Sequence, residues 1–176
     1  ILNSIQLNNL NNSIRMINVG GIIGYAVGSD TEIEITNIKN NAEYVAGYQN
    51  VGGLLGYVGD NIVIENTLSY EEVESTPVVG DKYYSMSYDS DNNPIYTLIT
   101  YSGSTTGTLY QLNEEESLST TGSISGVLNV GGAFGHFAGK KASGIWTDSS
   151  VYGNASVGGF IGYITNSNSN ISGNIV

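Results

Sequence analysis

One heptapeptide recurs four times in the chain and constrains its fold more than any other feature. The copies read VGGIIGY from Val19, VGGLLGY from Val51, VGGAFGH from Val130 and VGGFIGY from Val157. Asn precedes three of the copies and Ser156 precedes the fourth. The starts are 32, 79 and 27 residues apart. Two of these spacings fall in the range of about 20–50 residues that is typical of stacked repeat proteins, so we interpret the long middle gap as one repeat with an insertion.

The segments between the copies have the composition of short β-strands. Residues 32–36 (EIEIT) alternate apolar and polar side chains, residues 61–65 (NIVIE) are rich in β-branched residues, and turn residues separate such segments. A repeat of this size cannot bury its own apolar face, but stacked repeats can, because equivalent strands then pair in parallel and in register. The pattern predicts an all-β chain folded as a parallel β-solenoid with about three strands per coil, in a single domain over residues 1–176.

The glycines of the heptapeptide are predicted to be structural. We expect them to adopt positive φ at corners of the coil and to let neighbouring backbones approach closely. We expect the recurrent Asn to form a side-chain ladder between coils. The predicted structural glycines are Gly20, Gly21, Gly24, Gly52, Gly53, Gly56, Gly131, Gly132, Gly135, Gly158, Gly159 and Gly162.

The heptapeptide resembles the GLUG repeat, a motif of the form (V)GG(L)(V)G found in tandem in large secreted and cell-surface proteins of bacteria and some protists. The same twelve glycines carry the resemblance, and the third copy departs from it, with His136 in place of Tyr. The resemblance implies a right-handed parallel β-helix. It also implies a non-catalytic, extracellular, adhesin-like segment of a large repeat protein, which in one version stacks into fibres. The alternative is an accessory region of an exported peptidase or glycan-active enzyme. The resemblance brings no catalytic residue and no cofactor.

Composition excludes several classes of partner. The chain has 5 Lys and Arg against 16 Asp and Glu, a net charge of −11. So few cations cannot form a basic patch, which argues against nucleic acid and an anionic membrane surface as partners. No apolar run approaches the roughly 18 residues of a membrane span. The absence of Cys excludes disulfides and thiol chemistry. Because the chain begins at Ile1 without a charged leader, we interpret it as a segment of a longer protein.

The insertion, about residues 67–123, differs from the repeats in composition. It contains 7 of the 13 Tyr and 9 of the 16 acidic residues, against one cation, Lys82. Strand patterns over residues 82–88, 95–101 and 106–112 predict a β-hairpin or small meander that projects from one coil. The Tyr residues either bind a protein or glycan surface ligand or fill the core of the meander. The candidate contact residues are Tyr83, Tyr84, Tyr88, Tyr96 and Tyr101.

Three sets of residues invite a chemical role. Asp89, Asp91 and Asn93 match the start of a calcium-binding loop, but Pro94 and Thr100 stand where that loop needs Gly and Glu, so we expect a solvated turn, with a looser calcium site as the alternative. The acidic residues 71, 72, 74 and 114–116 resemble solvated loop charges more than a glycosidase pair. The only histidine, His136, lacks a nucleophile motif around it. We therefore expect no enzymatic activity.

Overall fold

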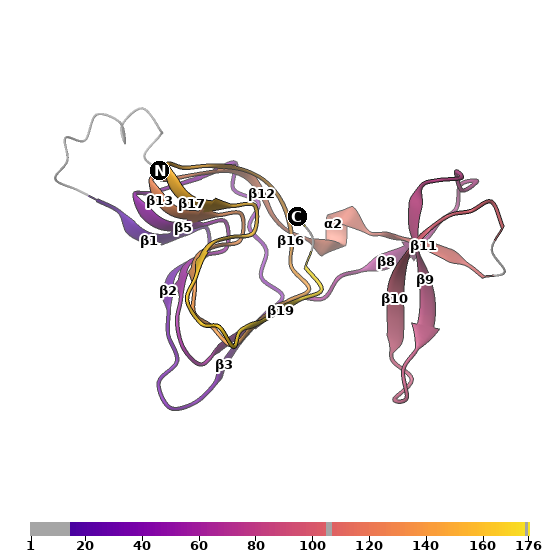
Figure 1. Cartoon of the computed structure of the whole chain (residues 1–176), viewed down its shortest axis with the longest axis horizontal. Coiled ribbons are helices and arrows are strands. Elements are labelled where there is room, and N and C mark those ends of the chain that lie inside the picture. Colours follow the sequence, from indigo (N-terminus) through magenta and orange to yellow (C-terminus); the bar gives the residue numbers. More distant parts are fainter. Residues whose placement is uncertain (1–14, 105–106, 175) are drawn as a thin grey trace. The chain divides into compact units, whose positions relative to one another are not determined.

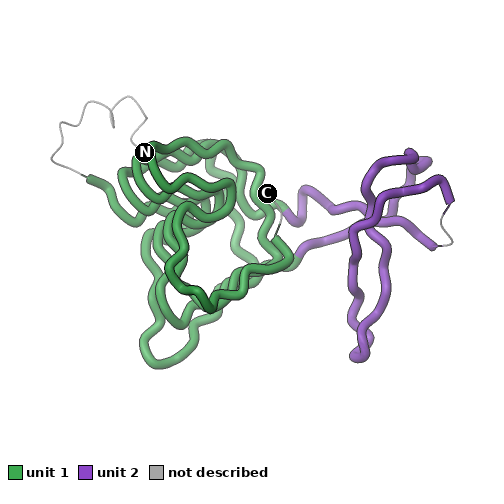
Figure 2. The backbone as a smooth tube through the Cα atoms, in the orientation of Figure 1, with its two compact units in different colours: residues 1–67, 118–176 green, residues 68–117 purple. Residues whose placement is uncertain are grey.

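The computed structural model describes residues 15–104, 107–174 and 176. These residues belong to two compact units, coloured separately in Figure 2. Unit 1 combines Ile1–Thr67 with Leu118–Val176, and unit 2 is Leu68–Ser117. The insertion is therefore shorter than expected at its end. Residues 118–123, which the sequence analysis placed in the insertion, pair as part of a strand within unit 1.

Unit 1 consists of parallel β-sheets, which we label A to D (Figure 1). Sheet A contains, in order, β1 (Ile17–Gly20), β5 (Gln49–Gly52), β13 (Leu128–Gly131) and β17 (Ala155–Gly158). Sheet B contains β2 (Ile23–Ala26), β6 (Leu55–Val58), β14 (Phe134–Phe137) and β18 (Ile161–Ile164). Sheet C contains β3 (Ile33–Thr36), β7 (Ile62–Glu65), β15 (Lys141–Ser143) and β19 (Asn170–Ser172). Sheet D contains β4 (Tyr44–Ala46), β12 (Leu118–Ser125) and β16 (Trp146–Tyr152).

The chain visits these sheets in the same order on each passage, and we call one passage a circuit. Circuits 1 to 4 cover residues 17–46, 49–125, 128–152 and 155–172, and unit 2 interrupts circuit 2. Successive circuits pair in register, so that Val19 lies beside Val51, Val51 beside Val130 and Val130 beside Val157. The expected in-register stacking of the four heptapeptides is confirmed, and unit 1 is all-β with parallel strands.

Each of the first three circuits contains four strands rather than about three. The difference arises inside the heptapeptide, because a bend at Gly21 and Ile22 divides it between β1 and β2. The same bend recurs in every copy. A single apolar run therefore contributes to two sheets.

The core of unit 1 lies between its sheets. The larger cluster connects sheets B and C and includes Leu54, Leu55, Phe134 and Phe137, all without exposed surface. A smaller cluster connects sheets A and D through side chains such as Val51 and Val130. Burial of one such side chain contributes about 1.5–3 kcal/mol to the free energy of folding. Each further copy of the heptapeptide adds more buried side chains and so increases this contribution.

The residue before each heptapeptide has a positive φ. The glycines of the heptapeptide, for which we expected this conformation, do not. Asn18, Asn50 and Asn129 have φ of 55°, 53° and 55°, and Ser156 has 53°, whereas no heptapeptide glycine has a positive φ. The earlier expectation is therefore wrong in this respect. Asn tolerates this conformation, and its side chain adds a second function. Nδ2 of Asn50 donates to Oδ1 of Asn18 at 2.7 Å, and Nδ2 of Asn129 donates to Oδ1 of Asn50 at 2.7 Å.

The heptapeptide glycines instead permit close approach of backbones. A Cβ atom at Gly135 would lie 2.3 Å from the backbone nitrogen of Val51 in the neighbouring circuit. No side chain can occupy that space, so the last Gly of the motif is required by the stacking itself.

Unit 2 is an antiparallel sheet, sheet E, with one short helix. Sheet E contains, in order, β10 (Pro94–Thr100), β9 (Lys82–Tyr88), β11 (Leu109–Leu112) and β8 (Tyr70–Glu72), and α2 covers Glu114–Ser117. The β9–β10 hairpin agrees with the strand patterns in the sequence. In the part of the chain that the structure describes, no helix has the length and hydropathy needed to cross a membrane.

The Asn ladder yields a prediction about stability. We expect Asn50→Ala to lower the free energy of unfolding by about 2–3 kcal/mol, because it removes two side-chain hydrogen bonds and places at positive φ a residue without the short polar side chain that makes this conformation tolerable for Asn. Asn50→Gly tolerates that φ and should cost less, about 1–2 kcal/mol. Urea unfolding followed by circular dichroism measures both values. Equal losses for the two variants would contradict the assigned role of the φ angle.

Candidate functional site

The aromatic side chains of unit 2 form its most distinctive surface. Tyr70, Tyr84, Tyr96 and Tyr110, which we call the tyrosine cluster, come from four different strands of sheet E. The ring of Tyr70 stacks on that of Tyr96 with centroids 4.0 Å apart and meets that of Tyr84 edge-on at 4.8 Å. The rings of Tyr96 and Tyr110 meet edge-on at 5.4 Å. Contacts of this kind contribute about 0.5–1.5 kcal/mol each beyond burial.

The environment of the cluster favours the neutral form of two of its phenols, those of Tyr70 and Tyr110. Partial burial, followed by the proximity of Tyr84 and Tyr96, raises the pKa of Tyr70. Desolvation by neighbouring groups, followed by the negative charge of Glu72, raises the pKa of Tyr110. All four cluster side chains are half-buried. They therefore stabilise the sheet, and part of each side chain remains accessible to solvent.

The structure divides the five candidate contact residues among three environments. Tyr84 and Tyr96 belong to the tyrosine cluster. Tyr83 and Tyr101 meet edge-on at 6.1 Å, and the hydroxyl oxygen of Tyr83 accepts a hydrogen bond from the Val78 backbone nitrogen at 3.0 Å. Tyr88 is 58% exposed and is the most accessible of the five.

Two members of the tyrosine cluster, Tyr70 and Tyr110, were not among the predicted contact residues. Their strands, β8 and β11, lie 37 residues apart in the chain between Glu72 and Leu109. The antiparallel pair of Tyr110 with Glu72 places them beside each other. In the sequence, each of the two strands is a short segment with one Tyr, and nothing else indicates that Tyr70 and Tyr110 belong to the tyrosine cluster.

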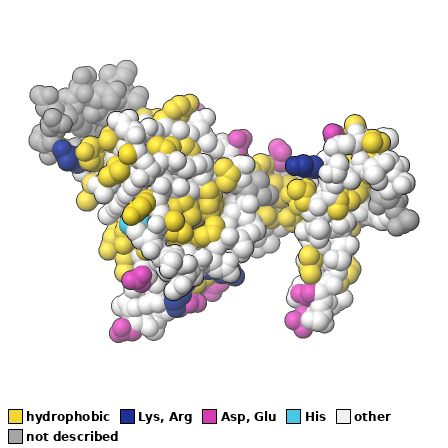
Figure 3. Space-filling model, viewed as in Figure 1, with side chains coloured by type: hydrophobic (Ala, Val, Ile, Leu, Met, Phe, Trp, Pro, Cys, Tyr) yellow, Lys and Arg dark blue, Asp and Glu magenta, His cyan; other side chains and the backbone are white. Residues whose placement is uncertain are grey.

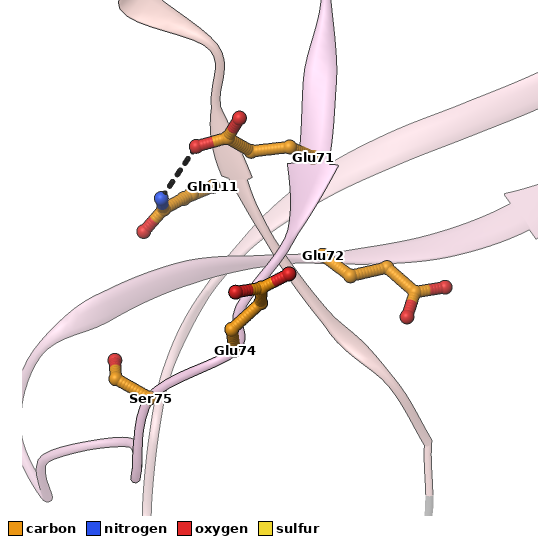
Figure 4. A pocket seen from close by; sticks show the side chains of 5 residues that line it. All are labelled: Glu71, Glu72, Glu74, Ser75 and Gln111. Carbon is orange, nitrogen blue, oxygen red and sulfur yellow. Dashed lines mark hydrogen bonds between the residues drawn. The ribbon is translucent and has the colours of Figure 1, made fainter.

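Acidic side chains surround two shallow hollows at the β8 and β11 edge of sheet E. One has a volume of about 450 Å³ and is lined by Glu71, Glu72, Glu74, Ser75 and Gln111 (Figure 4). The other, about 510 Å³, shares Glu71 and Gln111 with the first and adds Leu112, Asn113, Glu114 and Glu115. Nε2 of Gln111 donates to Oε1 of Glu71 at 2.7 Å. Figure 4 shows the Glu72 carboxylate directed away from that pair.

The carboxylates around the two hollows are exposed to solvent. Glu116 accepts a hydrogen bond from the Ser69 hydroxyl at 2.6 Å. A glycosidase acid needs a buried, apolar environment that keeps its proton at neutral pH. Exposed carboxylates instead suit polar ligands bound at the surface.

The segment considered as a calcium loop forms the turn of the β9–β10 hairpin. Oδ1 of Asp89 accepts hydrogen bonds from the backbone nitrogens of Asp91 at 2.9 Å and Asn93 at 2.8 Å. These bonds, above all those from Asn93, lower the pKa of Asp89. Among the described residues, no group of three or more acidic or histidine side chains is placed to hold a metal ion. The carboxylate of Asp89 thus serves the turn.

The seventh positions of the heptapeptides form a second aromatic surface, on sheet B. Tyr25, Tyr57, His136 and Tyr163, which we call the aromatic stripe, lie in register on neighbouring strands. The Tyr25 and Tyr57 rings stack with centroids 5.0 Å apart, and His136 meets Tyr57 and Tyr163 edge-on at 4.7 Å and 5.2 Å. Figure 3 shows the single histidine, in cyan, among hydrophobic side chains.

His136 occupies a structural position in this stripe. Its Nε2 lies 2.9 Å from Oγ1 of Thr165, and burial lowers its pKa. Between two tyrosine rings, the neutral imidazole acts as an aromatic member of the row. His136 thus packs against two tyrosine rings and forms a hydrogen bond with the hydroxyl group of Thr165.

Comparisons of the chain with protein-family models, curated proteins and solved structures found no match. The resemblance to the GLUG repeat therefore depends on the four heptapeptides alone. Two surfaces offer binding chemistry by their geometry. They are the tyrosine cluster with its acidic hollows in unit 2 and the aromatic stripe in unit 1.

The lowered pKa of His136 predicts a pH dependence of stability. The imidazole in the unfolded chain has a pKa of about 6.5. As the pH falls, it therefore takes up a proton at a higher pH than the imidazole in the folded protein does. Unfolding should therefore become easier as the pH falls from about 7 through 6.5, and this contribution should level off below the folded pKa. His136→Tyr, which restores the residue of the other copies, should remove this part of the dependence. Urea unfolding at a series of pH values measures it, and identical profiles for both proteins would contradict the assignment.

Proposed function

We propose that unit 1 is a right-handed parallel β-helix of the GLUG-repeat type, and that the chain is a non-catalytic structural and adhesive segment of a large secreted or cell-surface protein. The observation that carries this proposal is the in-register stacking of all four heptapeptides along sheets A and B. Such stacking adds about 4.8 Å of length per circuit and can be repeated without changing the core. This is the property that a spacer on a cell surface needs.

The energetic organisation of unit 1 supports a structural function. Apolar residues form continuous buried rows, and the Asn ladder satisfies polar groups at the turn before each heptapeptide. Each circuit is stabilised by its neighbours rather than by its own contacts. A rod of this kind resists local unfolding wherever both neighbours are present.

Unit 2 supplies the adhesive part of the proposal. Its half-buried Tyr rings present flat apolar surfaces, while Glu71, Gln111 and the other residues of the hollows present hydrogen-bonding groups. Tyr gives a large amphipathic contact area at a low cost in conformational entropy. A glycan or protein surface ligand fits this combination, because both offer apolar patches next to hydroxyl or amide groups.

A binding experiment tests the adhesive role. Tyr88→Ala should weaken binding to a panel of immobilised glycans and extracellular proteins at least about fivefold, since it removes an exposed ring that is near enough to Tyr110 of the tyrosine cluster to contribute to the raised pKa of that residue. Tyr152→Ala is the matched control, because Tyr152 is 59% exposed in sheet D and Tyr88 is 58% exposed in sheet E. Surface plasmon resonance measures both affinities.

The same experiment can contradict the proposal in two ways. The wild-type chain could bind no member of the panel, or Tyr88→Ala and Tyr152→Ala could change the affinity equally. Cleavage of a peptide or glycan by the isolated chain, abolished by His136→Ala, would overturn the non-catalytic assignment.

A further inference from the structure

The two outer strands of sheet E differ in how they are protected against the addition of another strand. β8 is three residues long and contains Glu71 and Glu72. β10 is seven residues long, reads PIYTLIT and carries no charge, with Pro94 only at its first position. All nine acidic residues of unit 2 lie outside β10. Exposed edge strands are usually short or protected by charges or Pro, so β10 has the composition of an inner strand at the edge of its sheet.

The free side of β10 belongs to unit 2 itself, because β10 lies between β9 and β11 in the chain. In sheet E it pairs with β9 alone, in an unbroken register from Pro94 with Tyr88 to Thr100 with Lys82. Among the described residues, no other backbone-to-backbone hydrogen bond reaches residues 94–100. One side of β10 therefore has no strand partner in the part of the chain that the structure describes.

Alternate residues of β10 direct their backbone groups to this free side. At the two ends of the β9–β10 pair, the carbonyl oxygen of Asn93 accepts a hydrogen bond from the backbone nitrogen of Asp89 at 3.0 Å, and the backbone nitrogen of Tyr101 donates to the carbonyl oxygen of Asp81 at 2.8 Å. Because the direction alternates along an antiparallel strand, odd-numbered residues of β10 bond to β9 and even-numbered residues point away from it. The free side thus offers the N–H groups of Tyr96, Leu98 and Thr100 and the carbonyl oxygens of Pro94, Tyr96, Leu98 and Thr100.

Apolar side chains border the free side on both faces of the sheet. Ile95 is 45% exposed, and Leu98 is 51% exposed. Leu98 pairs with Tyr84 and so lies on the face of the tyrosine cluster, whereas Ile95 lies on the opposite face, because side chains alternate along a strand. A strand added at the free side therefore covers apolar surface on both faces.

The side chains of β10 match those of a second β10 when the two strands run antiparallel about Thr97. In that register Thr97 lies opposite its own counterpart, Ile95 opposite Ile99, and Tyr96 opposite Leu98. Directly opposed Thr residues can hydrogen-bond, and opposed apolar residues bury each other. No charge lies opposite another charge, although unit 2 is strongly acidic elsewhere. One strand thus supplies both halves of a matched contact, which indicates a second copy of the chain as the occupant.

The backbone groups also match in this register. The N–H and carbonyl groups of Tyr96 meet those of Leu98 of the second copy, and the N–H of Thr100 meets the carbonyl oxygen of Pro94. Because Pro94, which has no N–H, falls at the end of the paired segment, only the carbonyl oxygen of Thr100 is left without a donor.

Neighbouring registers fit less well. A shift that places Tyr96 opposite itself moves Pro94 opposite Leu98 and loses a hydrogen bond inside the ladder. The opposite shift places Leu98 opposite itself and leaves Pro94 and Ile95 outside the paired strands. The register about Thr97 is therefore the one that uses the whole of β10.

We propose that β10 pairs with β10 of a second copy of this chain in this register, so that unit 2 mediates a two-fold symmetric dimer. The two copies of sheet E then form one continuous sheet. Residues opposite each other in an antiparallel pair point to the same face, so both tyrosine clusters lie on the same side of that sheet. Both copies use the same surface, so the contact closes at the dimer. This dimer goes beyond the proposed function and depends on unit 2 alone.

Sedimentation equilibrium on the wild-type chain tests the dimer. The mass should rise with concentration from the 18.6 kDa of the monomer to twice that value and no further. A single strand pair is smaller than a standard protein interface, so we expect the midpoint of this rise between about 1 μM and 1 mM.

A charge swap at the two-fold axis tests the register. Thr97→Lys and Thr97→Glu each place like charges directly opposite each other, so each variant should remain at the monomer mass with an unchanged circular dichroism spectrum. An equimolar mixture should recover the dimer, because Lys then lies opposite Glu. Ser87→Lys is the matched control and should dimerise like wild type. Ser87 is exposed, as Thr97 is, and its pairing with Ile95 places it on the same face but one strand away from the free side.

Single thiols report the same geometry, since the chain has no Cys. With oxidised glutathione as the oxidant, Thr97→Cys should form a disulfide-linked dimer, because residues directly opposite each other lie within the reach of a disulfide. Ser87→Cys should form none, because three strand spacings, about 14 Å, separate the two Ser87 positions. This measurement also covers the case in which a charged variant misfolds.

Four results would overturn the dimer. These are a wild-type mass that stays at 18.6 kDa up to about 1 mM, dimers of Thr97→Lys or Thr97→Glu alone at wild-type strength, a mixture of the two that stays monomeric, and equal disulfide formation by Thr97→Cys and Ser87→Cys. A monomeric wild-type chain that binds an uncharged peptide of alternating Thr and Val would assign the free side to a strand of another protein instead.

The dimer and the adhesive function can fail separately. A wild-type chain that stays monomeric but loses ligand binding through Tyr88→Ala would reject the dimer and leave the adhesive function intact. A chain that dimerises through β10 but binds no member of the ligand panel would reject the adhesive function and leave the dimer intact.

Discussion

The structure of unit 1 depends on how closely the backbones of successive circuits approach at the heptapeptide. A carbonyl oxygen of the next circuit occupies the place where a side chain would begin at Gly21, Gly53 and Gly132. This approach keeps equivalent strands in parallel register. Register in turn aligns the buried rows of Val, Leu and Phe and brings the Asn side chains within hydrogen-bonding distance. Glycine is thus the condition for both the core and the ladder.

The four heptapeptides have similar sequences but contribute unequally to stability, because they are buried to different extents. The second and third heptapeptides are buried from both sides, whereas the first and fourth have a described neighbour on one side only. In a stacked repeat, most stability comes from the interfaces between units. The terminal circuits therefore carry apolar side chains that the chain's own contacts leave partly exposed.

The two units form their small cores from different kinds of side chain. Unit 1 uses aliphatic side chains and two Phe packed between parallel sheets, whereas unit 2 uses mutually contacting Tyr rings on an antiparallel sheet. Tyr fills space and keeps a polar group at its outer end, so one cluster can stabilise a sheet and still meet a ligand. The two interpretations of the Tyr residues, core and contact surface, are therefore compatible.

The sequence by itself determined the repeat, the all-β class and the β9–β10 hairpin, because strand alternation, turn residues and motif recurrence are properties of neighbouring residues. Only the tertiary structure decided that each heptapeptide bends into two sheets, that Asn rather than Gly takes the positive φ, and that β12 belongs to unit 1. It also decided that Tyr70 and Tyr110 join Tyr84 and Tyr96. These outcomes depend on pairing between residues far apart in the chain, and a local pattern contains no information about which distant strand becomes its neighbour.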